Sequence, residues 1–384
     1  MKRIAITLNR KALDVKKRMF VNGIFQNIYS LYNLLQDTGK YEVSIIVDRS
    51  TTDIKEDYKD FAQVKKDVKE VYPHLDICHK EIMFGLDDRS KFDVMLEVGY
   101  MFGAEDIEIV KKANPGIKVA MISYGNIYFG AAETLTNGSD NAPPDFAQNR
   151  DGVWISPHFA ETLSWYETMY GTKGAIAPYI WSPKFIDQQL KDAGLEKEDL
   201  QKKSRKLVSV MEPNLGIVKT CMIPAAIFEN LYNRTQDEEL GCYLFNSHKL
   251  IQNKTAIALF NRMKTVKDKK IYFEKRFHFS DIFSKYCGTL LSHQHHCELN
   301  YLYLEAFHLD VPLVHNSHAF KDAGFYYEGF NVSQGADQLQ KAIDDPRTEL
   351  INGEAGKDYI WKHSPENPDN IQGYVDLIEG LFTD

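Results

Sequence analysis

The sequence lacks the features of a membrane-spanning or exported protein. No apolar run reaches the ~18 residues that a membrane-spanning helix needs. The first residues, MKRIAITLNRKALD, hold too few apolar side chains before charge returns to form a signal peptide. The five cysteines are scattered and include no CxxC pair, which is typical of reduced thiols. We therefore expect a cytoplasmic protein.

Two common phosphate-binding motifs are also missing. No GxGxxG follows the first apolar run, which argues against a nicotinamide enzyme, and there is no Walker motif. The net charge is −8, so the surface as a whole does not indicate nucleic-acid binding. Basic residues cluster only locally, at 10–18, 201–206 and 264–270. Any nucleotide site must therefore be built from other groups.

Apolar runs alternate with amphipathic ones along the chain, as in a parallel α/β protein. The 384 residues are enough for two cores. We predict two Rossmann-like, doubly wound domains, 1–180 and 181–365, and a C-terminal helix over 366–384 that packs on the first domain. The predicted strands are 2–9, 41–48, 91–99, 118–125, 152–159, 205–214, 241–247, 270–277, 287–294 and 311–316, and the predicted helices are 23–39, 105–113, 217–233 and 280–285.

The segment HHCELNYLYLEAFHLDVPLVHNS, residues 295–317, allows three interpretations. It begins with zinc-type donors, but no second pair lies at a structural-zinc spacing, so we expect no metal site. Leu299, Leu302, Ala306 and Leu309 follow helical spacing and should face the sheet. The core interpretation leaves the two glutamates of the segment unexplained.

Glu298 and Glu305 lie seven residues apart, so they should stand on one side of a helix that opens near Glu298. Ligands of open α/β sheets bind beyond the carboxyl ends of the strands. A helix N-terminus there suits a pyrophosphate, and a carboxylate suits ribose hydroxyls. The segment therefore predicts a nucleotide pocket.

These residues resemble the donor site of GT-B glycosyltransferases, whose two Rossmann-like domains face each other across a cleft. Many of them carry Glu-x7-Glu, with the second glutamate on the nucleotide ribose, whereas this chain has Glu-x6-Glu. The VPLVHN and YYEGF segments also resemble a bacterial and phage family of uncharacterised proteins assigned to the glycosyltransferases. The resemblance implies a nucleoside diphosphate sugar as donor, without a cofactor or a metal ion.

The resemblance also implies which residues bind the donor. Lys219 should lie early in the first helix of the second domain, against the donor phosphates. Asn316, Ser317 and His318 should follow a strand and face the cleft. The full predicted donor set is Lys219, His293, His295, Glu298, Leu299, Asn300 and Glu305.

The first domain should receive the acceptor. The loop after the first strand is rich in basic residues, and residues 133–150 form a long polar segment of the kind that is often functional. The predicted acceptor side comprises Arg10, Lys16, Lys17, Arg18, Tyr124 and Asn126. The catalytic base stays open among Glu97, Glu133, Asp140 and His158.

We therefore expect a glycosyltransferase that acts on a hydroxyl group. The acceptor is either DNA with hydroxymethylated bases, in a phage-infected bacterial cell, or a saccharide in the form of a surface glycan. The alternatives are a non-catalytic nucleotide- or sugar-binding protein and a nucleotide-sugar epimerase of the same fold.

Overall fold

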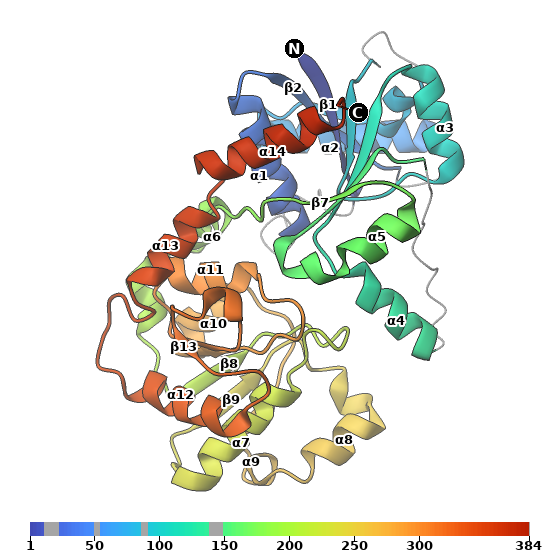
Figure 1. Cartoon of the computed structure of the whole chain (residues 1–384). Coiled ribbons are helices and arrows are strands. Elements are labelled where there is room, and N and C mark those ends of the chain that lie inside the picture. The colour runs from blue at the N-terminus through green and yellow to red at the C-terminus, as the bar shows by residue number, and fades with distance from the viewer. Residues whose placement is uncertain (11–22, 50–53, 86–90, 138–148, 384) are drawn as a thin grey trace. The chain divides into compact units, whose positions relative to one another are not determined.

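A computed structural model describes residues 1–10, 23–49, 54–85, 91–137 and 149–383, and the chain forms two compact units (Figure 1). One unit comprises Met1–Phe185 with His363–Asp384, and the other comprises Ile186–Lys362. Each unit contains one parallel sheet and helices that connect its strands. The predicted α/β class with two doubly wound sheets is confirmed. Within the described ranges, no helix is long and apolar enough to cross a membrane.

The N-terminal sheet has seven parallel strands in the order β3-β2-β1-β4-β5-β6-β7. The first strand is central and its residues Ile4–Ile6 are fully buried, which explains why its sequence is a continuous apolar run instead of an alternating one. The direction of winding reverses between β1 and β4. The strands are β1 (Lys2–Leu8), β2 (Tyr41–Val47), β3 (Ile77–His79), β4 (Val94–Glu97), β5 (Lys118–Ser123), β6 (Gly152–Ile155) and β7 (Gly174–Ile176).

The C-terminal segment of the chain belongs to this N-terminal unit. In α14, Tyr374, Val375 and Ile378 join the same hydrophobic cluster as Ile4 of β1. The Tyr374 hydroxyl donates to the carbonyl of Pro178 at 2.8 Å. The other helices of the unit are α1 (Gly23–Asp37), α2 (Ile54–Val71), α3 (Ala104–Ala113), α4 (Ile127–Asn137), α5 (Leu163–Tyr170) and the start of α6 (Lys184–Ala193), and α14 is Pro368–Gly380.

The C-terminal sheet repeats this winding in the order β10-β9-β8-β11-β12-β13, again with all strands parallel. The reversal here lies between β8 and β11, which is the switch point where ligands of such sheets bind. The strands are β8 (Leu207–Val210), β9 (Gly241–Leu244), β10 (Ile271–Phe273), β11 (Thr289–Leu291), β12 (Leu313–His315) and β13 (Phe325–Tyr326). The helices are α7 (Met222–Thr235), α8 (Lys254–Phe260), α9 (Lys264–Lys267), α10 (Phe279–Lys285), α11 (Tyr301–His308), α12 (Val332–Asp344) and α13 (Glu354–Lys362).

Several local predictions were wrong. Helix α4 occupies 127–137, where the sequence suggested that a loop begins at 133. The edge strand β7, residues 174–176, pairs with β6 and was not among the predicted strands. The short strands β3 and β13 were not predicted, because two or three residues are too few to show a period.

Candidate functional site

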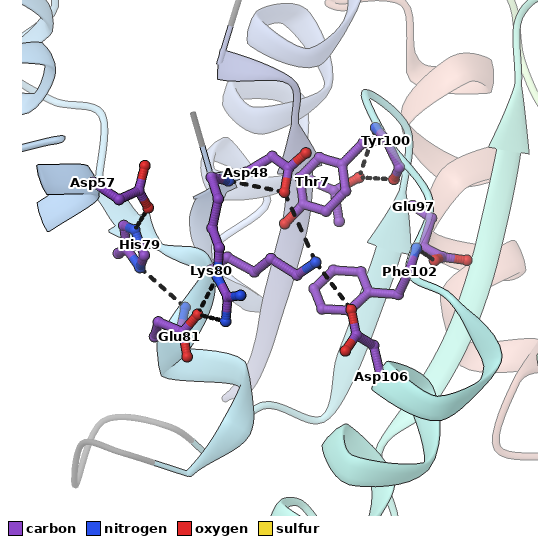
Figure 2. Close-up of polar contacts among 11 residues, drawn as sticks. Thr7, Asp48, Asp57, His79, Lys80, Glu81, Glu97, Tyr100, Phe102 and Asp106 are labelled. Carbon is purple, nitrogen blue, oxygen red and sulfur yellow. Dashed lines mark hydrogen bonds and ion pairs between the residues drawn. The ribbon is translucent and has the colours of Figure 1, made fainter. Parts of the chain in front are cut away.

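Charged side chains at the carboxyl edge of the N-terminal sheet are paired with one another (Figure 2). The Lys80 ammonium lies 3.0 Å from the Asp106 carboxylate and 3.8 Å from that of Asp48. It also lies over the Phe102 ring, 4.5 Å from the centroid. Lys80 thus joins the ends of β2 and β3 to helix α3, and this set of charges stabilises the fold.

Arg10, predicted on the acceptor side, is buried beside these charges. Its guanidinium pairs with Asp57 at 3.0 Å and with Asp60, and Arg10 is only 8% exposed. Asp57 also accepts a hydrogen bond from Nε2 of His79 at 2.6 Å, because Nδ1 of that ring accepts from the Glu81 N–H at 3.2 Å. A buried arginine that neutralises two carboxylates has a structural role.

Glu97, a candidate base, is the carboxylate of a buried ion pair. Arg150 donates to both of its oxygens, and the N–H of Phe102 donates to Oε1 at 2.6 Å. The side chains of Glu97 and Arg150 are both 0% exposed. Removing either partner would leave an uncompensated buried charge. Glu97 therefore has a structural role, and its charge is taken up by Arg150, which argues against Glu97 as the base.

Tyr124 and Asn126 position helices. The Tyr124 hydroxyl lies 3.0 Å from the hydroxyl of Tyr374 in α14. The Asn126 side-chain oxygen accepts from the N–H of Phe129 at 3.1 Å, close to the start of α4. The Asn126 side-chain nitrogen is buried and forms no hydrogen bond with a described residue, so a role of Asn126 on the acceptor side stays a prediction.

Two candidate bases remain among the described residues. His158 lies just after β6, in the short 3-10 helix Pro157–Thr162, and its ring stands edge-on to Tyr179 with the centroids 5.8 Å apart. Glu133 lies within α4 and is half-buried. The structure thus places His158 three residues after the end of β6, at the carboxyl edge of the sheet, and Glu133 ten residues after the end of β5. Asp140, Lys16, Lys17 and Arg18 lie outside the described residues.

In the C-terminal unit, the loops after β8 and β11 are joined at the switch point. The N–H of His295 donates to the carbonyl of Val218 at 3.0 Å. Asn214 takes a left-handed conformation with φ 53°, and its side chain accepts from the N–H of Cys221 at 2.8 Å. The loop before α7 is therefore an ordered turn.

Lys219 lies in this loop, and α7 begins three residues later, at Met222. The prediction that Lys219 stands early in the helix was wrong, because the turn built on Asn214 extends to Cys221. Burial raises the pKa of the Glu212 carboxyl and of the Cys297 thiol, and the nearby Lys219 ammonium opposes both rises. Lys219 thus supplies one positive charge at the switch point.

The Glu212 carboxylate accepts several hydrogen bonds at the switch point of the C-terminal sheet. Glu212 follows β8 and is 1% exposed. Its carboxylate accepts from the Ser292 hydroxyl, from the N–H of His293 at 3.2 Å and from the Gln294 side-chain amide at 3.2 Å. Because these three donors belong to consecutive residues, Glu212 fixes the loop after β11.

His293 carries a buried ring nitrogen that lacks a partner. The Tyr327 hydroxyl donates its single proton to the carbonyl of Ser292 at 3.1 Å. The Nδ1 of His293, 3.0 Å from that hydroxyl, must therefore be the donor. Burial lowers the pKa of His293 to about 4, so the ring is neutral at pH 7. Its Nε2 keeps a lone pair, which no described residue satisfies.

Near His293, in the loops after β11 and β12, two more buried polar atoms lack a partner among the described residues, Oε1 of Gln294 and Oγ of Ser317. Gln294 is 3% exposed and Ser317 is 0% exposed. Asn316 joins the two loops, because its side chain bonds both the N–H and the carbonyl of Gln294 at 2.8 Å. Buried polar atoms without partners are uncommon in native proteins. Three of them in adjacent loops indicate a site for a polar ligand.

Glu298 does not lie on the same helix as Glu305. Helix α11 begins at Tyr301, because the Asn300 side chain accepts from the N–H of Leu302 at 3.2 Å and caps the helix. Glu298 lies in the preceding loop and accepts from the N–H of Ala319 at 3.1 Å. The prediction that both glutamates share one helix face was therefore wrong.

Glu305 lies in the middle of α11 and is half-buried. Its side chain forms no hydrogen bond or ion pair with a described residue. Burial raises its pKa to about 8, so the carboxyl group is largely protonated at pH 7. Leu299, another predicted donor residue, is 7% exposed and belongs to the core.

The His-His-Cys sequence forms no metal centre with its described surroundings. The rings of His295 and His296 lie 4.4 Å apart with planes at 69°. Across the described parts of the chain, no group of three or more His, Cys, Asp and Glu side chains is arranged to hold a metal ion.

Sequence reasoning missed Glu212, Gln294 and Tyr327. Glu212 follows a predicted strand directly, within the segment EPNLG, and this position was a usable signal. No sequence signal pairs Gln294 with Glu212 or Tyr327 with His293, because these pairs are 82 and 34 residues apart.

Several solved structures resemble the fold of this chain over nearly its whole length. Trehalose 6-phosphate synthase from Burkholderia multivorans is 12% identical, with a TM-score of 0.58 over 100% of this chain and 99% of its own. A glycosyltransferase from Rickettsia africae is 10% identical, with a TM-score of 0.55 over 100% of this chain and 99% of its own. HepE from Anabaena, solved with UDP-glucose, is 10% identical, with a TM-score of 0.54 over 99% of this chain and 100% of its own. These similarities confirm the GT-B fold.

The sequence matches none of the curated proteins. A family model described as "Protein of unknown function (DUF2827)" matches residues 4–378.

Proposed function

The chain belongs to the DUF2827 family, and we propose that it is a glycosyltransferase that moves a sugar from a nucleoside diphosphate sugar to a hydroxyl acceptor. The observation that carries the proposal is the set of buried, unpartnered atoms: Nε2 of His293, Oε1 of Gln294 and Oγ of Ser317. They lie at the carboxyl edge of a doubly wound sheet, where nucleotides bind in such folds. A polar, many-hydroxyl ligand supplies the hydrogen bonds that these atoms lack.

Each donor-binding residue has a role that matches its chemistry. Lys219 faces the diphosphate, because it brings a positive charge to the switch point. Glu305 holds the ribose, and its carboxyl group, with a pKa of about 8, can both donate to and accept from hydroxyl groups. The Nε2 of His293 accepts from a donor hydroxyl.

In the reaction, the acceptor oxygen forms a bond to the anomeric carbon while the bond from that carbon to the diphosphate oxygen breaks. The diphosphate leaves with the bonding electrons, and Lys219 stabilises its charge without a resident metal ion. The acceptor proton passes to a base. We favour His158 for this role over Glu133, because His158 directly follows a strand at the ligand-binding edge.

The acceptor is either a hydroxymethylated base in DNA or a saccharide. The burial of Arg10 removes one of the basic residues that favoured DNA. Replacement of Lys16, Lys17 and Arg18 together by alanine should weaken binding to duplex DNA and reduce its salt dependence, but should leave a neutral glycan acceptor nearly unaffected. Mobility shifts of plain and hydroxymethylated duplexes at two salt concentrations separate the two acceptors.

The donor proposal is tested with a panel of nucleoside diphosphate sugars. We expect one of them to bind and to release nucleoside diphosphate in the presence of acceptor. His293→Ala should weaken donor binding by ~10-fold, the effect of one hydrogen bond. His74→Ala, at an exposed position in the N-terminal unit, serves as the control.

The other outcomes distinguish the alternatives. Binding without turnover would support the non-catalytic protein, and interconversion of the sugar would support the epimerase. If no nucleotide binds to the folded protein, the proposal is wrong.

A further inference from the structure

One exposed segment of the C-terminal unit combines basic and aliphatic side chains. No acidic residue occurs from Leu240 to Lys267, a stretch that contains five lysines and arginines, although the whole chain holds 54 acidic residues against 46 basic ones. The segment follows β9 and includes helix α8, which lies at the edge of the unit (Figure 1). The charge of this segment is therefore opposite in sign to the net charge of the whole chain.

The aliphatic side chains of this segment are exposed too. Ile251 is 57% exposed, Ile257 is 40% exposed and Leu259 is 41% exposed. The opposite side of α8 is anchored, because Phe260 belongs to the core of the unit and Ala256 packs against it. At 100° per residue, Ile257 and Leu259 then lie on the two flanks of the helix, and Lys254 lies on its outer face between them.

The basic side chains are available for a partner. Lys249, Lys254, Arg262 and Lys267 are exposed and form no ion pair with a described residue. Lys264 is the exception, since it pairs with Asp268. The surface of residues 249–267 therefore carries four unpaired positive charges and three exposed aliphatic side chains.

We propose that this surface, residues 249–267, docks the protein on a membrane rich in anionic lipid. The lysines and arginine attract lipid phosphates and carboxylates, and the aliphatic side chains enter the boundary between headgroups and acyl chains. Charge alone would also suit a nucleic acid. The exposed side chains are isoleucine and leucine, however, and these gain nothing from a phosphate backbone and cannot stack on bases as aromatic rings do.

The position of the surface has a functional consequence, which rests on the proposed glycosyl transfer. The segment leaves β9 at its carboxyl end, and β9 is the direct neighbour of β8, after which the switch-point loop begins. Docking therefore brings lipid to the edge of the sheet where we propose that the donor binds. This arrangement suits a membrane-borne glycan acceptor.

Co-sedimentation of the full chain with vesicles tests the docking independently of any donor or transfer. We expect binding to phosphatidylglycerol vesicles, no binding to phosphatidylcholine vesicles, and loss of binding at high salt. Lys249→Gln, Lys254→Gln and Arg262→Gln together should weaken binding ~100-fold, at roughly fivefold per charge. The control is Lys66→Gln, Lys112→Gln and Lys341→Gln, which removes three exposed charges elsewhere and should bind like the unmodified chain.

A second variant distinguishes membrane binding from binding to another kind of partner. Ile251→Ser, Ile257→Ser and Leu259→Ser should also weaken vesicle binding. Equal binding by all variants, or no binding to anionic vesicles at low salt, would overturn the proposal. Binding to nucleic acid that ignores the serine substitutions, or a dimer that these substitutions dissociate, would replace the membrane with that partner.

Discussion

The Asn316 side chain forms hydrogen bonds with both the N–H and the carbonyl of the Gln294 main chain. Its side-chain oxygen accepts from the Gln294 N–H, and its side-chain nitrogen donates to the Gln294 carbonyl, each at 2.8 Å. The same nitrogen donates to the carbonyl of Gly329 at 3.2 Å. One side chain at the end of β12 therefore fixes the loops after β11 and β13, and so the positions of the unpartnered atoms.

Asn316→Ala should lower the free energy of unfolding by ~1–3 kcal/mol, because it leaves polar groups of the Gln294 main chain without partners. Urea denaturation measures this change, with Asn261→Ala on the surface as the control. Donor binding should weaken as well, since the loop is no longer fixed. Unchanged stability together with unchanged binding would contradict this role.

The raised pKa of Glu305 predicts a pH-dependent stability. In the folded state its pKa is about 8, against an ordinary value of 4.5. Between these values the folded chain holds a proton that the unfolded chain has released. The free energy of unfolding should therefore fall as the pH rises through this window.

Glu305→Gln removes this titration. The variant and the unmodified chain should differ least near pH 4.5, and the variant should gain relative stability up to about pH 8. Denaturant unfolding at several pH values tests this, with Glu354→Gln, which is exposed, as the control. Parallel pH profiles for the two chains would show that Glu305 titrates normally.

The parts of the molecule that the sequence predicted are those with a local signal. The buried central strands, such as β1, appear as continuous apolar runs because both of their faces are covered. Glu305 was found through a motif of the family that the segment resembles, and its wider role in donor binding stays a prediction. The start of α11 was misplaced by three residues, because the Asn300 cap was overlooked in favour of the nearby glutamate.

The parts that escaped prediction depend on contacts between distant residues. Glu212 accepts a hydrogen bond from Ser292, which lies 80 residues away in the chain. No periodicity in the sequence indicates such a pair. Arg10 was expected in an exposed basic loop, but Asp57 and Asp60 bury it. Charge on a side chain in the sequence does not reveal whether a carboxylate from another element will neutralise it.

A close contact between β1 and the loop after β4 predicts the effect of a small substitution. A Cβ atom at Gly99 would lie 2.7 Å from the Cα of Leu8 and 2.9 Å from the carbonyl oxygen of Thr7. Gly99→Ala should therefore destabilise the N-terminal unit by ~1–3 kcal/mol. Gly125→Ala is the control, because its Cβ would meet nothing within 4 Å. Equal melting temperatures for the two variants would contradict the close packing at β1.

The last prediction concerns the proton on His293. The Tyr327 hydroxyl accepts from Nδ1 while it donates to the Ser292 carbonyl, and this arrangement keeps the lone pair on Nε2. Tyr327→Phe removes the acceptor. The proton should then shift toward Nε2, which turns the ligand-facing atom from an acceptor into a donor.

Nitrogen-15 NMR of histidine-labelled protein at pH 7 should therefore show the Nδ1–H form of His293 in the unmodified chain and a shift toward the Nε2–H form in Tyr327→Phe. Donor affinity should fall by ~10-fold, the equivalent of one hydrogen bond. The neighbouring Tyr326, whose hydroxyl bonds Glu328 at 2.6 Å, provides the control Tyr326→Phe. An unchanged tautomer with weaker binding would assign the loss to the disrupted loop, and full affinity with a changed tautomer would remove His293 Nε2 from the donor site.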